Sequence, residues 1–531
     1  MNYGFNIIIQ LFFFIFFSLS ILGYGFFLKN RILRINFNFG ETGILGFFAL
    51  YIISVLINFF FAIDLYISLV VLFFGLILFL KNISNIYISK KLFFFLTFLT
   101  LFISSLTINL HDDHLLYQLP YINYKQEFKI IFGFVFLNDY LAYSHGLYDI
   151  MALFKLPFYE NRLIFILPII FFMFFIFSIL DYFNKEHNIL STLIIFIILL
   201  TLFKFTRSKE FGTDVPVIGL LFLIQIYSLI YFFNNEKKYF YKMIVMFSLA
   251  AIFKIYSVLA IFYFFIFIKK FKIYLIDLFT KQKVIIIFLI FTSIVTFTKN
   301  FIHSGCLSYP ATITCIDQKL IPWSAGKKLS NWRQEFLEAG VKGWNPYIRD
   351  NEYKIKMLPA EYNEKFKYNF HKNVFKDPDL ERILVVALIL MSTFALTISK
   401  NNGASAQYKP QNYNYFVVIS FVPLILWFLL MPYIRYGGYA YLSFGMLILF
   451  YSFIFRSFNY SRIINFLLII GIVFFLLKNF LRIDKEINSM SNFTLNSYKT
   501  KQSYPIPFFR DFEVKEKIID EKRKIYISNH N

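Results

Sequence analysis

Residues Phe5 to Leu28 read FNIIIQLFFFIFFSLSILGYGFFL, a continuous apolar run without a charged side chain. A helix crosses the hydrocarbon core of a bilayer with about 20 apolar residues, so this run is long enough to span it. A membrane β-barrel instead has segments of about ten residues with alternating polarity. Because similar continuous runs recur along the chain, as from Ile383 to Ile398, the sequence predicts an all-α polytopic membrane protein.

The composition of the 531 residues supports this prediction. Apolar and aromatic residues make up 58%, and charged residues make up only 16%, against about 25% in soluble domains. These values, with a mean hydropathy of +0.62, exclude a soluble enzyme and a disordered chain. The net charge is +22, but Lys and Arg gather in short loops, as the positive-inside rule requires. Nucleic acid is not an expected partner, because no basic soluble domain is evident.

The alternation of apolar runs with basic or polar loops predicts about 14 transmembrane helices with both termini outside. The first run lacks the basic start of a signal peptide and is expected to be retained. The expected regions are N-terminal accessory helices at 1–91, a transmembrane core at 92–298 with a first outer loop at 110–162, a large extracytoplasmic loop at 299–382, C-terminal transmembrane helices at 383–480, and an extracytoplasmic tail at 481–531.

The run from Met243 to Ile268 does not fit a single crossing. Lys254 lies near its middle, and a lysine at mid-membrane costs about 2.5 kcal/mol or more. A single helix would also place the basic residues that follow, such as Lys269, on the outer side. Two short helices with an outer turn at Lys254 remove both difficulties, so we predict a reversal there. A lysine that snorkels from one helix is the alternative.

The strongest candidate site is the segment 110–120, LHDDHLLYQLP, in the first outer loop. Asp112 and Asp113 directly follow an outward-going helix, where acidic pairs are costly unless they serve a purpose. Asp113 and Tyr117 are four residues apart and therefore share one face of a helix. We expect this helix and a second one within 145–157 to be amphipathic and to lie on the outer membrane surface.

Two other interpretations of this segment are open. An aspartate at a helix start is favoured as a cap without any chemistry. His111, Asp112, Asp113 and His114 carry the side chains that bind divalent ions, but contiguous ligands rarely converge on one ion without strain. We therefore expect no metal and no other cofactor, with a divalent metal as the alternative.

The Asp113-x-x-x-Tyr117 motif after a transmembrane helix resembles the GT-C superfamily of membrane glycosyltransferases, whose members include protein O-mannosyltransferases and bacterial aminoarabinose transferases. Within it, the chain is most similar to a bacterial family of uncharacterised polytopic GT-C-like proteins. Further matching stretches follow in order over roughly residues 92 to 480: GFVFLN (133–138), SKEFGTD (208–214), FKIYS (253–257), KNFIHSG (299–305) with Tyr309-Pro310, and PYIRYG (432–437). Lys299 stands where Arg is usual, which weakens a bidentate phosphate contact.

The resemblance implies a GT-C-like fold and an inverting transfer of a sugar from a polyprenyl-phosphate donor to an extracytoplasmic glycan or lipid acceptor. Such a reaction needs a carboxylate base and cations that stabilise the departing phosphate. Asp113 is then the catalytic base, and the substrate-binding residues of one outer cavity are Asp112, Tyr117, Lys254, Lys299 and Arg435. The implied location is the bacterial inner membrane, with the active site on the extracytoplasmic side and membrane lipids as further partners.

Two other functions share this topology. An envelope polysaccharide polymerase or ligase would rely on basic outer-loop residues. A lipid-linked oligosaccharide transporter would show internal repeats and polar sites at the membrane midplane, and neither is evident in the sequence. Structural roles are also open for single residues: Arg435 and Lys299 as interfacial anchors and Asp214 as a helix cap.

Cys306 and Cys315 are the two cysteines of the chain, and both lie in the 299–382 loop. Because this loop is expected in an oxidising compartment, we predict a disulfide between them. A short closed loop gives an expected stabilisation of about 2–3 kcal/mol. Two unrelated thiols are the alternative.

Overall fold

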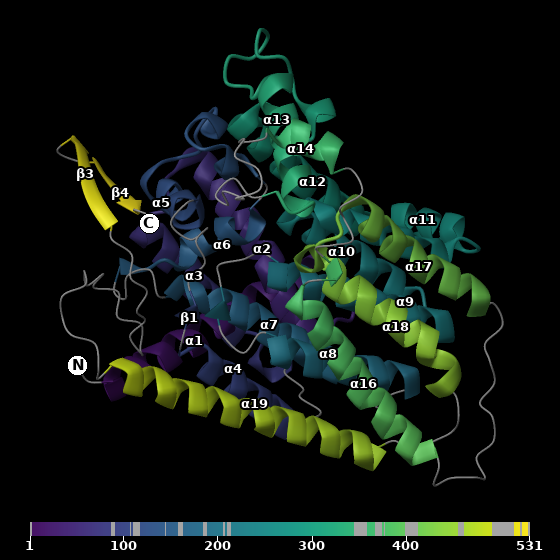
Figure 1. The fold of residues 1–531 in the computed structure, drawn as a ribbon. Helices are drawn as coiled ribbons and strands as arrows, with labels where there is room; N and C mark the ends of the chain where they lie inside the picture. The colour runs from purple at the N-terminus through teal and green to yellow at the C-terminus, as the bar shows by residue number, and fades with distance from the viewer. Residues whose placement is uncertain are drawn as a thin grey trace.

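The computed structural model describes residues 3–85, 91–106, 108–109, 117–143, 145–157, 163–183, 188–204, 208–209, 214–344, 358–366, 374–375, 377–398, 413–454, 461–490, 514–520 and 523–528. Helices dominate these ranges (Figure 1). Six described helices are long and apolar enough to cross a membrane, and five shorter apolar helices accompany them. The predicted helical membrane protein is therefore confirmed, and the count of about 14 spans stays a prediction.

The N-terminal helices pack closely through small residues. They are α1 (Tyr3–Phe27), the π-helical turn η1 (Leu28–Leu33), α2 (Phe39–Phe60) and α3 (Leu65–Leu80). A Cβ atom on Gly23 would lie 1.8 Å from the carbonyl oxygen of Gly75, so the backbones of α1 and α3 touch where both residues are glycines. Asp64 caps α3 by accepting a hydrogen bond from the Ile67 amide at 2.9 Å, which fixes where this helix begins after α2.

The central part holds the elements of the site and of the outer loops. In chain order they are η2 (Ile83–Asn85), α4 (Lys91–Ser104), β1 (Ile108–Asn109), α5 (Leu119–Glu127), η4 (Phe134–Phe136), η5 (Asp139–Ala142), α6 (Gly146–Phe154), α7 (Ile166–Leu180), α8 (Asn188–Lys204), β2 (Ser208–Lys209), α9 (Asp214–Asn234), α10 (Lys238–Phe253), η7 (Ile255–Phe267), α11 (Phe271–Thr280) and α12 (Lys283–Ser304). β1 and β2 form a short parallel pair.

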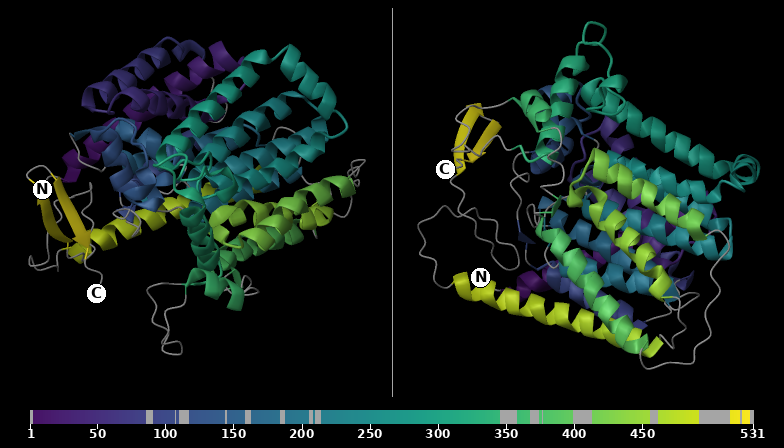
Figure 2. Two further views of the ribbon diagram at one scale, coloured as in Figure 1. Left: turned by 90° about the horizontal axis from the view of Figure 1, so that it is seen from above. Right: turned by 45° about the vertical axis from the view of Figure 1, so that its right-hand side comes forward.

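The remaining elements form the large outer loop and the C-terminal part. They are η8 (Thr312–Thr314), α13 (Gly326–Val341), α14 (Pro359–Lys365), α16 (Pro378–Ile398), α17 (Tyr413–Leu430), η9 (Ile434–Gly438), α18 (Tyr439–Ile454), α19 (Ser461–Met490), β3 (Val514–Asp520) and β4 (Arg523–Ser528). α13 and α14 project from the helical bundle, and α19 lies along α4 and α8 at its edge (Figures 1 and 2). The antiparallel pair β3–β4 and the pair β1–β2 are the exceptions to the all-helical prediction.

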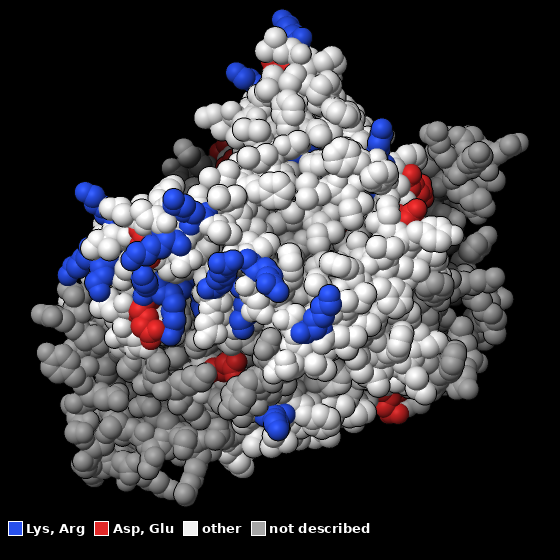
Figure 3. All heavy atoms as spheres, turned by 180° about the vertical axis from the view of Figure 1, so that it is seen from behind, with Lys and Arg blue, Asp and Glu red and all other residues white. Residues whose placement is uncertain are grey.

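Contacts between α2 and α12 define the two ends of the bundle. The Phe48 and Phe288 rings lie 5.0 Å apart, and the Tyr51 hydroxyl bonds Thr296 at 2.9 Å, so both helices run in the same direction. Their first turns lie near basic loops, whose exposed residues include Arg31, Arg34, Lys237, Lys238, Lys269, Lys270, Lys272, Lys281 and Lys283. Figure 3 shows Lys and Arg gathered on one part of the surface. We call the end of the bundle with these loops the basic end.

The predicted reversal at Lys254 is confirmed. α10 ends at Phe253, Lys254 is extended (φ −155°, ψ 130°), and the 3₁₀ helix η7 begins at Ile255. The Phe240 ring at the start of α10 lies 5.0 Å from the Phe267 ring at the end of η7, so the two helices are antiparallel. Lys254 therefore lies at the end of the bundle opposite the basic end.

Predictions for three helices differ from the structure, two in where the helix ends and one in where it lies. The helix predicted to end before Lys299 continues to Ser304, because the Lys299 ammonium is paired inside the bundle. The predicted amphipathic surface helix at 145–157 is α6, but all nine of its residues are buried, so it packs inside the protein. The last helix, α19, extends to Met490, beyond the predicted end at residue 480.

Candidate functional site

The first cluster of charges, the Asp214 cluster, forms where the ends of several helices meet. Asp214 begins α9, Lys254 occupies the break between α10 and η7, and Arg435 lies in η9 between α17 and α18. The Lys254 Nζ atom lies 3.6 Å from Asp214 Oδ1, and the Arg435 Nε atom donates to Asp214 Oδ2. Segments more than 200 residues apart in sequence thus share one buried carboxylate.

The two cations of the Asp214 cluster remain accessible. The Asp214 side chain is 7% exposed, whereas those of Lys254 and Arg435 are 25% and 29% exposed. Both cations share the Asp214 carboxylate and are partly exposed, so an anion can approach them from solvent.

Aromatic rings and a glycine turn shape this cluster. The Tyr256 and Tyr436 rings lie 5.6 Å apart, and Tyr433 packs on Tyr436 at 5.2 Å. Gly437 has a φ of +88°, which lets η9 turn sharply after Arg435, and a Cβ there would lie 2.8 Å from the Tyr441 ring. The backbone turn thus fixes where Arg435 enters the cluster.

A second cluster, the Asp149 cluster, is sealed from solvent. Asp149 of α6 lies 2.7 Å from the Lys125 ammonium and 2.7 Å from the Lys299 ammonium, and the Tyr121 hydroxyl donates to it at 2.7 Å. The side chains of Lys125, Lys299 and Asp149 are 4%, 0% and 0% exposed. Burial alone would raise the pKa of Asp149, but the two ammonium groups outweigh it and hold that pKa below its usual range.

His145 lies between the two clusters. A Cβ atom on the adjacent Gly146 would meet Ile252 and Phe253 side chains at 2.8 Å, so the start of α6 packs on the end of α10, beside Lys254. Burial, with Lys254 and Lys299 nearby, lowers the pKa of His145 to about 3, although a hydrogen bond to the Tyr140 carbonyl opposes this. His145 is therefore neutral at physiological pH.

The predicted site residues do not all meet in one cavity. Lys254 and Arg435 are brought together, as predicted. Lys299 is not with them, because it is fully buried and paired with Asp149. Asp112 and Asp113 lie outside the described residues.

Both described flanks of segment 110–116 lie near this region. Asn109 of β1 pairs with Lys209 of β2, which shortly precedes Asp214. Tyr117 is buried and stacks on Tyr140 at 5.1 Å and on His145 at 5.6 Å. Tyr117 is thus part of the site region through its contact with His145.

A family model described as "Domain of unknown function (DUF8201)" matches residues 7–443. The chain belongs to this family. No curated protein and no solved structure matches the chain significantly. The range that the family model matches includes both charge clusters.

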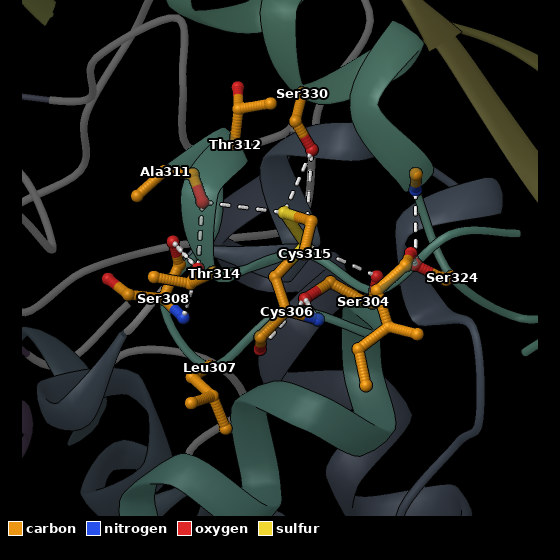
Figure 4. The surroundings of a disulfide bond; sticks show 12 residues. Ser304, Cys306, Leu307, Ser308, Ala311, Thr312, Thr314, Cys315, Ser324 and Ser330 are labelled. Carbon is orange, nitrogen blue, oxygen red and sulfur yellow. Dashed lines mark hydrogen bonds between the residues drawn. A yellow bond between two sulfur atoms is a disulfide. The ribbon is translucent and has the colours of Figure 1, made fainter.

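The predicted disulfide between Cys306 and Cys315 is confirmed, with the two Cα atoms 3.9 Å apart. The Cys315 sulfur lies 3.1 Å from the Ser330 hydroxyl of α13, and Figure 4 shows Ser330 directed at the sulfur. The disulfide therefore closes the turn that follows α12, and its sulfur contacts α13 through Ser330.

Sequence reasoning missed Asp149 and Lys125 and gave Asp214 only a capping role. The signal for Asp149 was present, since it is the one charged residue of the apolar stretch GLYDIMALF. A lone charge in a buried helix predicts a charged partner elsewhere, although it cannot say which one. Among the described residues, no group of three or more His, Cys, Asp or Glu side chains could hold a metal ion.

Proposed function

We propose that the protein is a GT-C-type glycosyltransferase of the bacterial inner membrane, which transfers a sugar from a polyprenyl-phosphate donor to a glycan or lipid acceptor. The observation that carries the proposal is the Asp214 cluster, in which two partly exposed cations share one buried carboxylate. A phosphate is the natural ligand for such a pair. The Arg435 guanidinium can donate to two phosphate oxygens, and the Lys254 ammonium supplies a point charge.

Two observations support an extracytoplasmic site. The exposed Lys and Arg loops gather at the other end of the bundle, and such loops favour the cytoplasm. The disulfide lies at the same end as the site, since Cys306 directly follows the last turn of α12. Disulfides persist in oxidising compartments outside the cytoplasm.

The proposed reaction is a single displacement with inversion. The acceptor hydroxyl attacks the anomeric carbon, the bond from that carbon to the phosphate oxygen breaks, and the phosphate leaves with the bonding electrons toward Lys254 and Arg435. A carboxylate takes the hydroxyl proton. Asp149 and Asp214 are each held by two cations and are poor bases. Asp113 of the Asp-x-x-x-Tyr motif is therefore our candidate, with Asp112 as a substrate contact.

The test uses the purified full chain in lipid nanodiscs with a polyprenyl-phosphate sugar. Lys254→Ala and Arg435→Ala should each lower the transfer rate about 100-fold, because each removes a cation from the departing phosphate. Lys237→Ala is the matched control, since that lysine is 53% exposed, pairs with Asp277 and lies at the basic end, away from the Asp214 cluster. Asp113→Asn should lower the rate about 10²–10⁴-fold, and Asp112→Asn much less.

The same purified chain, reconstituted in liposomes that enclose an inner compartment, separates the other functions. Movement of the lipid-linked sugar across the membrane without turnover would overturn the proposal in favour of a transporter. Elongation of a glycan chain by repeated units would identify a polymerase or ligase. Normal transfer by both cation variants would remove the Asp214 cluster from the reaction.

A further inference from the structure

A stack of four side chains connects the outer-loop helix α13 to the site region. The Arg333 guanidinium carbon lies 3.7 Å from the centroid of the Tyr140 ring. The Tyr140 and Tyr117 rings are 5.1 Å apart with planes within 9°, and Tyr117 lies 5.6 Å from the His145 ring at 22°. The distances and near-parallel planes are those of favourable cation–π and stacking contacts.

Arg333 is fixed in this position from its other sides. Its side chain is only 1% exposed, although an arginine is seldom buried. The Nη1 atom lies 3.2 Å from Asp139 Oδ2, and Nε donates to the Tyr143 hydroxyl at 2.5 Å. All these partners belong to residues 139–143, so Arg333 binds one short segment of the first outer loop.

The helix that carries Arg333 is itself held by the disulfide. Ser330 lies three residues before Arg333 on α13, and its hydroxyl is 3.1 Å from the Cys315 sulfur (Figure 4). Residues three apart on a helix share a face. The disulfide therefore sets the position of the face of α13 that presents Arg333.

We propose that Arg333 is a positioning residue, which acts through Tyr140 and Tyr117 to hold His145 against the end of α10, beside Lys254. We call the stack of Arg333, Tyr140, Tyr117 and His145 the clamp. Its role in catalysis rests on the proposed function, but its existence does not. A planar guanidinium is required, because a lysine ammonium cannot stack on Tyr140 and donate to Asp139 and Tyr143 in the same geometry.

The test measures amide hydrogen exchange of the purified full chain in nanodiscs. Arg333→Lys should speed exchange about tenfold in peptides covering 117–121 and 145–150, because the clamp resists local opening. Exchange in α2 and α9 should stay unchanged, which separates a lost clamp from general unfolding. Lys328→Arg on the same helix is the matched control, since Lys328 is exposed and the substitution keeps its charge.

Three further experiments test the role of Arg333. Tyr140→Phe keeps the ring and should retain slow exchange, whereas Tyr140→Leu should behave like Arg333→Lys. Reduction of the disulfide should give the same pattern in the same two segments. In the transfer assay, Arg333→Lys should lower kcat while donor affinity stays within about twofold, because Arg333 does not touch the phosphate site.

Unchanged exchange at 117–121 and 145–150 in Arg333→Lys would overturn the inference. Equal acceleration in α2 and α9 would do the same, since it would show a general loss of stability. If the wild-type protein transfers no sugar, the proposed function fails, and the exchange result still decides whether the clamp exists.

Discussion

Glu41 and Asp214 are both buried carboxylates, and they lie at opposite ends of the bundle. Lys242, at the start of α10, pairs with Glu41 at 2.6 Å, and Lys254, just past the end of the same helix, pairs with Asp214 at 3.6 Å. The Tyr182 and Tyr227 hydroxyls also donate to Glu41, at 2.5 and 2.6 Å. Glu41 is thus surrounded by three side-chain donors, and its cation is only 4% exposed.

The difference in solvent access separates a structural ion pair from a candidate site. The partners of Glu41 come from the turn after α7, from α9 and from α10, so this pair fastens the N-terminal helices to the core. The partners of Asp214 are a quarter exposed or more, so a ligand can reach them. The same residue types therefore have different roles at the two positions, and the exposure of the cations distinguishes these roles.

The largest expected effect is on stability, at Glu41. Glu41→Gln leaves the buried Lys242 ammonium without its counter-charge and should lower the free energy of unfolding by about 3–5 kcal/mol. Denaturant unfolding in detergent measures the change. Glu236→Gln is the control, because Glu236 is 41% exposed in its pair with Lys238 and should change stability by about 0.5 kcal/mol or less. A Glu41 variant as stable as this control would refute the structural role.

The disulfide should have the second-largest effect on stability. Replacing Cys306 and Cys315 together by alanine should lower the free energy of unfolding by about 2–3 kcal/mol, because the open loop gains entropy in the unfolded chain. Reductant should shift the wild-type unfolding midpoint to that of the double variant and leave the double variant unchanged. A midpoint that reductant does not move in the wild type would contradict this expectation.

The pH dependence of stability should report His145. Burial lowers its pKa to about 3, below the value of about 6.5 in an unfolded chain, so the unfolded state binds more protons between these values. Stability should therefore fall as the pH falls through 6.5, by about 2 kcal/mol between pH 7 and pH 5. His145→Gln should lose this part of the dependence. Identical slopes for variant and wild type would exclude His145 as the group responsible.

The local pattern of the sequence was sufficient for several features of the fold. Continuous apolar runs gave the helical membrane class, and the charge on both flanks of Met243 to Ile268 required the reversal at Lys254. The disulfide followed from two cysteines in one outer loop. Each of these depends on residues near one another in the chain.

The parts that could not be predicted depend on distant partners. The sequence places Lys299 at the start of an outer loop, because a lysine inside a span is costly. Only its pairing with Asp149, 150 residues earlier, explains its burial. The same holds for Asp214, whose partner Arg435 lies 221 residues later. Without co-varying sequences, nothing in a single chain pairs such residues.

The smallest expected effect on stability is at Asp214, and it completes the comparison. Asp214→Asn keeps the shape of the side chain and removes its charge, but water can hydrate Lys254 and Arg435 because both are partly exposed. The free energy of unfolding should therefore fall by only about 1 kcal/mol, well below the loss at Glu41. Binding of a polyprenyl phosphate in nanodiscs should be retained or tightened, since the two cations lose their competing carboxylate. A loss of stability as large as that of Glu41→Gln, together with lost phosphate binding, would make the Asp214 cluster a second structural ion pair.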